Sequence, residues 1–150
     1  MKDQFELFVA NLQDRIFKDA QQAYGEVGFQ RWRNPLYRDR MANPDASAQV
    51  KGPCGDTMEI YLKFENNRVT DASFFTDGCG ASTVCGSFAA ELALGRTPDE
   101  LAEISGDDIL QHIGRFPDDD RHCAFLAAET LQQALHAYMV KPSSAENPGR

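Results

Sequence analysis

The sequence predicts an α+β domain with a small, about three-stranded antiparallel sheet and helices packed on one face of that sheet. Residues 58–76 alternate apolar and polar side chains on either side of Asn66-Asn67, a pattern typical of a β-hairpin. After Thr76 the apolar residues recur instead at helical spacing as far as Tyr138. A length of 150 residues is that of one ordinary domain.

The sheet is predicted from three apolar segments. Met58, Ile60, Leu62 and Phe64 alternate with polar neighbours and form the first hairpin strand. The second hairpin strand runs from residue 69 to 76, with its alternation out of phase between residues 69 and 72. A lone hairpin is marginally stable, so we expect a third strand around residues 47–50.

The N-terminal region predicts one extra helix followed by irregular chain. Apolar residues spaced by three and four start at Phe5 and continue through Leu12 to Ile16, and the helix is expected to end near Tyr24-Gly25. From residue 31 to 49 the periodicity fails. We assign residues 1–33 to an N-terminal helical extension and residues 34–140 to the main domain.

Four helical segments are expected in the C-terminal half. An apolar stripe from Val84 to Leu92 stops at Gly95, and Thr97-Pro98-Asp99-Glu100 is a capping box that opens a short helix. Residues 109–113 form another helix, and a long C-terminal helix begins at Cys123. The tail, residues 141–150, is rich in Pro and Ser and is expected to be flexible.

Composition excludes several classes of function. Fifteen Lys and Arg against 23 Asp and Glu give a formal charge of −8, which disfavours nucleic-acid binding. There is no apolar run of the roughly 20 residues that a membrane span requires. The N-terminus lacks the apolar segment of a secretory signal, so we expect the cytoplasm, where clustered Cys indicates metal binding or catalysis more often than disulfides.

Three of the four cysteines lie where a loop meets a regular element. They occur in Gly52-Pro53-Cys54-Gly55-Asp56, in Asp77-Gly78-Cys79-Gly80 and in Arg121-His122-Cys123. Cysteines carried on such loops can converge in space. The glycines are expected to leave room for a bulky ligand beside the sulfurs. Cys54 and Asp56 point to the same side of an extended chain, which suits a shared metal.

The residues alone leave alternatives open. Cys85 lies on an apolar helical stripe and is expected in the core, whereas Cys123 fits either a core position or a ligand, and His122 either a cap or a ligand. Tetrahedral zinc and an iron–sulfur cluster would both accept the thiolates of Cys54, Cys79 and Cys123 together with Asp56 or His122. The prediction at this level is a metal or reactive-thiol site.

The order of these motifs, with Gly95-Arg96-Thr97 between the second and third, resembles the U-type iron–sulfur cluster assembly scaffolds, which are IscU, SufU and the N-terminal module of NifU. The similarity runs from about Asn34 to Tyr138. It implies a non-catalytic scaffold for a transient [2Fe–2S] or [4Fe–4S] cluster. The partners that it implies are a cysteine desulfurase, which supplies sulfur, and apo iron–sulfur acceptor proteins, which take the cluster.

The resemblance also assigns roles to single residues. Cys54 and Cys79 resemble the first two cluster cysteines, and Asp56 the aspartate linked to cluster lability. His122 and Cys123 resemble the histidine and third cysteine of the family, with Cys123 as the sulfur acceptor. The implied ligands are Cys54, Asp56, Cys79 and Cys123, with His122 as an alternative ligand.

Two departures from the family pattern affect the expected partners. IscU carries a Leu-Pro-Pro-Val-Lys stretch recognised by an Hsp70-type chaperone, and here Phe116-Pro117-Asp118-Asp119-Asp120 stands in its place, so the resemblance does not extend to that interaction. The N-terminal extension could serve homodimerisation or partner docking. The alternative functions are a zinc-bound sulfur-relay protein, or a structural zinc module, with zinc held in the isolated protein.

Overall fold

A single three-stranded antiparallel sheet forms the centre of the molecule in the computed structural model, which describes residues 3–53 and 55–141. Its strand order is β1-β2-β3, so each strand pairs with its neighbour in sequence. The predicted hairpin and the predicted third strand are both confirmed. The strands are β1 (Ala46–Lys51), β2 (Thr57–Glu65) and β3 (Arg68–Thr76).

The β2–β3 hairpin explains the irregular alternation in the sequence. Asn66 and Asn67 have φ angles of 54° and 63°, as a tight two-residue turn requires. The register then shifts, because Lys63 pairs with Asp71 whereas Phe64 pairs with Val69. Strand β3 therefore has one more residue than β2 at this point, which is a β-bulge. The bulge brings the apolar side chains of the rest of β3 onto the buried face of the sheet.

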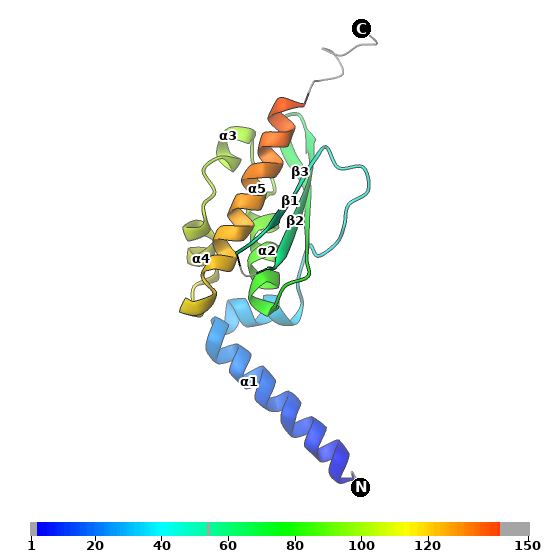
Figure 1. Cartoon of the computed structure of the whole chain (residues 1–150), viewed down its shortest axis with the longest axis vertical. Helices are drawn as coiled ribbons and strands as arrows, with labels where there is room; N and C mark the ends of the chain where they lie inside the picture. The colour runs from blue at the N-terminus through cyan, green and yellow to red at the C-terminus, as the bar shows by residue number, and fades with distance from the viewer. Residues whose placement is uncertain (1–2, 54, 142–150) are drawn as a thin grey trace.

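Helices cover one face of the sheet (Figure 1). Helix α5 packs on β1 and β2, α2 packs on β3, and α4 packs against both helices. The core between these layers contains the fully buried Met58, Ile60, Leu62, Phe74 and Leu131. The elements after the sheet are α2 (Gly80–Ala93), α3 (Pro98–Leu101), α4 (Gly106–Ile113), the 3₁₀ turn η1 (Asp118–Asp120) and α5 (His122–Val140).

The helix boundaries follow the predicted local signals. Thr97 and Glu100 form the reciprocal capping box at the start of α3. Gly95 follows the end of α2 and Gly114 caps the end of α4. Their φ angles of +81° and +93° favour glycine, which has no side chain to be strained there. Within the described part of the chain, every helix is too short or too polar to cross a bilayer.

Helix α1 (Gln4–Arg33) is longer than predicted. The helix is interrupted at Gly25, whose φ of 71° and ψ of −177° are not helical. The prediction of an end near this glycine is therefore right about the break but wrong about residues 26–33, which are again helical. The cause is tertiary packing on α2, because Phe29 is 3% exposed and Arg31 pairs with Glu91 at 2.6 Å, with its guanidinium over the ring of Phe88.

Candidate metal centre

Asp56, Cys79 and Cys123 converge on one point of the molecule. One ligand atom from each residue lies within 4.8 Å of the other two. Asp56 immediately precedes β2, Cys79 is the N-cap of α2, and Cys123 is in the first turn of α5. Residues far apart in sequence are therefore brought together by three separate junctions between loop and regular element.

The loop that carries Asp56 is a tight turn. The backbone N–H of Gly52 donates to the carbonyl of Asp56 at 2.7 Å, and the N–H of Gly55 donates to the carbonyl of Gly52 at 3.0 Å. Gly55 has a φ of +95°, a conformation that favours glycine. Cys54 lies outside the described residues, so its position beside this cluster stays a prediction.

Hydrogen bonds tie the loop of Cys79 to the start of β2. The carboxylate of Asp77 accepts from the N–H of Thr57 at 2.8 Å. The hydroxyl of Thr76 donates to the carbonyl of Thr57 at 2.6 Å and accepts from the N–H of Gly78 at 3.0 Å. Asp56 and Cys79 therefore hold their relative positions through contacts between their chain neighbours.

Ser82 is a site residue that the sequence analysis missed. Its hydroxyl is 2.9 Å from Oδ2 of Asp56 and 3.3 Å from Sγ of Cys123, so its single proton can serve either acceptor. The side chain is fully buried. Ser82 follows Cys79 by three residues on a helix, which places both on the same side of α2, and this spacing is the signal that could have identified it.

The space that the glycines beside Cys79 leave is occupied by side chains of the protein itself, which differs from the expectation that it admits a ligand. A Cβ on Gly78 would lie 2.6 Å from Oδ2 of Asp56 and 2.9 Å from the hydroxyl of Ser82. A Cβ on Gly80 would collide with the indole nitrogen of Trp32. The space that these glycines release is filled by the protein itself, and it allows Asp56 and Trp32 to approach the Cys79 loop.

The three converging residues differ in their exposure to solvent. Cys79 is exposed, Asp56 is half-buried, and Cys123 is 1% exposed. Cys79 has no side-chain capping bond and lies at the N-terminus of α2. His122 is exposed, and its Nε2 is 3.7 Å from Sγ of Cys123, so it can reach the same centre.

Two titratable groups near the three site residues have raised pKa values, chiefly because they are buried. Burial, with the negative charge of Asp120 and of Cys79 as smaller causes, raises the pKa of Tyr24 to about 12. Burial also raises the pKa of the Cys85 thiol well above its ordinary value. Cys85 is 0% exposed, which confirms its predicted place in the core.

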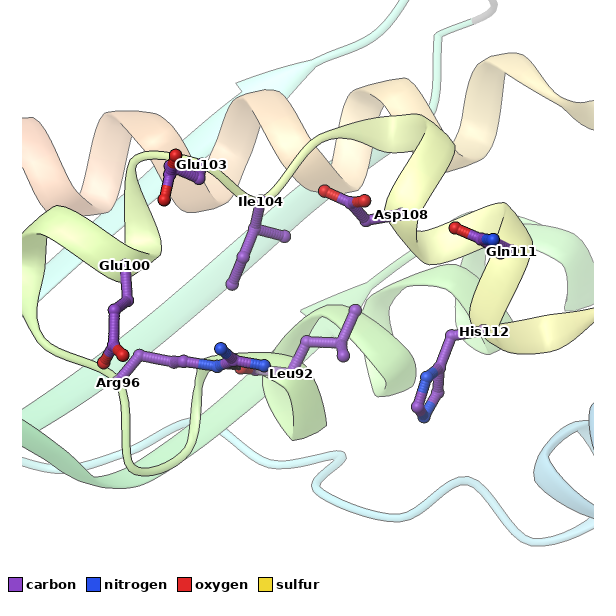
Figure 2. A pocket seen from close by; sticks show the side chains of 8 residues that line it. All are labelled: Leu92, Arg96, Glu100, Glu103, Ile104, Asp108, Gln111 and His112. Carbon is purple, nitrogen blue, oxygen red and sulfur yellow. Dashed lines mark hydrogen bonds between the residues drawn. The ribbon is translucent and has the colours of Figure 1, made fainter.

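A cavity of about 470 Å³ lies elsewhere on the surface, between the end of α2, α3 and α4 (Figure 2). Figure 2 shows that its polar lining consists of carboxylates, an amide, a guanidinium and an imidazole. None of the predicted site residues contributes to it. The lining residues are Leu92, Arg96, Glu100, Glu103, Ile104, Asp108, Gln111 and His112.

Two cysteine sulfurs and one carboxylate form a donor set suited to a soft or borderline metal such as zinc or the iron of a cluster. The fold and the site together define a small α+β protein with a candidate Cys/Asp metal centre at the junctions of its loops with β2, α2 and α5. The profile of the NifU-like N terminal domain matches residues 23–145. The chain belongs to this family.

Curated relatives are similar over most of the chain. "Iron-sulfur cluster assembly scaffold protein IscU 1" of Archaeoglobus fulgidus is 35% identical over 119 residues, which are 79% of this chain and 78% of the relative. "Iron-sulfur cluster assembly protein IscU" of Plasmodium falciparum is 37% identical over 99 residues, 66% of this chain and 60% of the relative. "Nitrogen fixation protein NifU" of Nostoc sp. is 30% identical over 96 residues, 63% of this chain and 32% of the relative.

Solved structures share the fold. A NifU-like protein (N-terminal) from Brucella abortus has a TM-score of 0.62 and 24% identity, covering 81% of this chain and 97% of the solved one. A putative iron-sulfur cluster assembly scaffold protein for the SUF system from Fervidobacterium islandicum has a TM-score of 0.63 and 20% identity, covering 77% and 98%. Both likenesses concern the architecture, α+β with helices over a small antiparallel sheet.

Proposed function

We propose that this protein is a non-catalytic scaffold on which an iron–sulfur cluster is assembled and from which the cluster is transferred. The observation that carries the proposal is the convergence of Asp56, Cys79 and Cys123 within 4.8 Å, in a chain of the NifU-like family. The names of the relatives, which are scaffolds and assembly proteins for such clusters, support the same role.

The proposed ligands are Cys54, Asp56, Cys79 and Cys123, with His122 as an alternative to Asp56. Thiolates are the principal ligands of iron–sulfur clusters. A carboxylate oxygen is a harder donor than a thiolate, and in the fourth position it should hold the soft cluster less firmly. A scaffold needs this property, because it has to release what it assembles.

Sulfur is proposed to come from a cysteine desulfurase in a reducing compartment such as the cytoplasm, with Cys123 as its acceptor. Cys123 is 1% exposed, whereas Cys79 lies on the surface. Direct delivery to Cys123 therefore requires the site to open locally. Cys79 lies on the solvent-exposed side of the site, and we propose that incoming sulfur and iron pass it first.

Anaerobic reconstitution tests the proposal. The apo protein is incubated with ferrous iron, cysteine, a cysteine desulfurase and a thiol reductant that converts the transferred sulfane sulfur to sulfide, and its visible spectrum is recorded. We expect sulfide-to-iron charge-transfer bands together with bound iron and acid-labile sulfide in stoichiometric amounts. A colourless protein that binds one zinc ion tightly would contradict the scaffold and favour a zinc-bound sulfur-relay protein or a structural zinc module, which the same donors fit.

A further inference from the structure

The first half of α1 is a helix without packing partners in the described chain. Figure 1 shows it projecting away from the body of the molecule. Every residue from 3 to 19 is exposed, and the packed part begins at Phe17, whose ring contacts Phe29 and Trp32 edge-on. We call residues 3–16 the arm. They precede residue 23, where the match to the family begins.

The arm carries an apolar stripe along one side. Its five members fall within an arc of about 100° when residues are placed 3.6 to the turn. They are 36–74% exposed, so the stripe offers on the order of 400 Å² of apolar surface, large for an unpartnered patch. An isolated helix of this length is marginal in water without a partner. The stripe consists of Phe5, Phe8, Val9, Leu12 and Ile16.

We infer that the stripe binds the same stripe of a second copy of this chain, with the two arms antiparallel. A twofold axis between Ala10 and Asn11 places Val9 opposite the partner's Leu12 and Phe5 opposite the partner's Ile16. Each of these pairs joins two side chains that differ in size or branching, and such pairs fill the space between two helices well. The apolar pattern of the arm is complementary to itself in this register.

The flanks of the stripe fit the same register. On one side Glu6 lies beside the partner's Gln13, an amide that can donate to a carboxylate. On the other side Arg15 lies beside the ring of the partner's Phe8, a favourable cation–π contact. The two copies of Glu6 are displaced by nine residues, or about 13 Å, along the axis, and so are the two copies of Arg15. No like charges are brought into contact.

A second copy fits the arm better than a membrane surface does. Lipid-binding amphipathic helices carry Lys and Arg on the polar face, whereas this arm carries Asp3 and Asp14 there and the chain has a formal charge of −8. Antiparallel pairing also places the two bodies at opposite ends of the paired arms. With flanking side chains included, the interface approaches the roughly 1,200 Å² at the low end of specific complexes, a size typical of weak association, so the dimer is tested at concentrations well above micromolar.

Sedimentation of the full chain tests the dimer. At concentrations well above micromolar the wild type should sediment at twice its chain mass of 16.7 kDa. The variant Val9→Asp/Leu12→Asp, at the centre of the stripe, should sediment at the chain mass. The matched control Leu7→Asp/Ala10→Asp adds two carboxylates on the side of the arm that faces away from the stripe and should remain dimeric. A wild type that stays at the chain mass overturns the proposal and assigns the stripe to another protein or a lipid surface, and so does a dimer that survives the stripe variant or dissociates in the control.

Cross-linking tests the orientation. A photoreactive phenylalanine analogue replaces Phe5 in the full chain, and the cross-linked peptides are mapped by mass spectrometry. The antiparallel register predicts cross-links to the peptide that contains the partner's Ile16. Cross-links between the two copies of position 5 would contradict the register, because they require parallel arms.

Discussion

The carboxylate of Asp56 accepts a hydrogen bond of 2.9 Å from the hydroxyl of Ser82, although the two residues are 26 positions apart. The bond joins the loop before β2 to the first turns of α2. It also brings a buried hydroxyl to within 3.3 Å of the sulfur of Cys123. Ser82 thus links Asp56 and Cys123 inside the candidate metal centre.

Ser82→Ala is expected to destabilise the metal-free protein more than the metal-loaded protein. A hydrogen bond to a charged group contributes about 1.5–3 kcal/mol, and its loss leaves the carboxylate of Asp56 poorly satisfied. When metal is bound, Asp56 has another partner, and the loss should be smaller. Urea unfolding of the apo and zinc-loaded forms measures the two free energies of unfolding. An equal loss in both forms would mean that Ser82 contributes only to packing.

Asp56→Ala should slow the loss of the cluster. Without the oxygen donor, the cluster is held by thiolates and by His122, which are softer ligands. We expect the rate of bleaching by an iron chelator to fall about tenfold, which corresponds to about 1.4 kcal/mol in activation free energy. Asp119→Ala is the matched control, because it removes an exposed carboxylate close to His122 in the sequence that is not one of the proposed ligands. Faster bleaching in Asp56→Ala would show that Asp56 stabilises the cluster.

The four cysteines should separate into two groups. Replacement of Cys54, Cys79 or Cys123 by Ser should prevent stable cluster assembly, because each change removes a proposed thiolate ligand. Cys85→Ala should leave assembly nearly intact and cost on the order of 1 kcal/mol of stability, since Cys85 is fully buried in the core. Iron and acid-labile sulfide after reconstitution measure assembly. Loss of the chromophore in Cys85→Ala would contradict its assignment to the core.

The raised pKa of Tyr24 predicts a loss of stability at high pH. Its phenol titrates near 10.0 in the unfolded chain and at about 12 in the folded protein. The folded state therefore favours the neutral phenol, and this contribution is complete below pH 10 and is lost as the pH rises from 10 towards 12. Tyr24→Phe removes the titrating group. The difference in unfolding free energy between wild type and Tyr24→Phe should change in favour of the variant over this window, and a constant difference would refute the prediction.

Much of the fold can be predicted because its signals are local. The Asn66-Asn67 turn, the capping box at Thr97 and the stop at Gly95 each depend on neighbouring residues alone. Helix α1 beyond Gly25 could not be predicted in this way, because its second segment packs on α2, where Arg31 pairs with Glu91 and Trp32 lies beside Gly80. Tertiary contacts here override the local pattern.

The candidate site likewise has parts that can be predicted from the sequence and parts that cannot. The junctions that carry Asp56, Cys79 and Cys123 are recognisable from residue types and spacing. Ser82 carries only the weak signal of its three-residue spacing from Cys79, because a serine in a helix is common, and its distance to Asp56 is what reveals its part. The space beside Gly80 is likewise filled by Trp32, a residue 48 positions earlier, and no local pattern indicates that contact.

Transfer of the cluster tests the central claim most directly. The reconstituted protein is mixed anaerobically with an apo iron–sulfur acceptor, and the charge-transfer bands of both proteins are followed after separation. The scaffold proposal predicts that the bands leave this protein and appear on the acceptor with iron and sulfide conserved, faster than from free iron and sulfide. Iron and sulfide that remain on this protein, or an acceptor that fills no faster than from free ions, would contradict it.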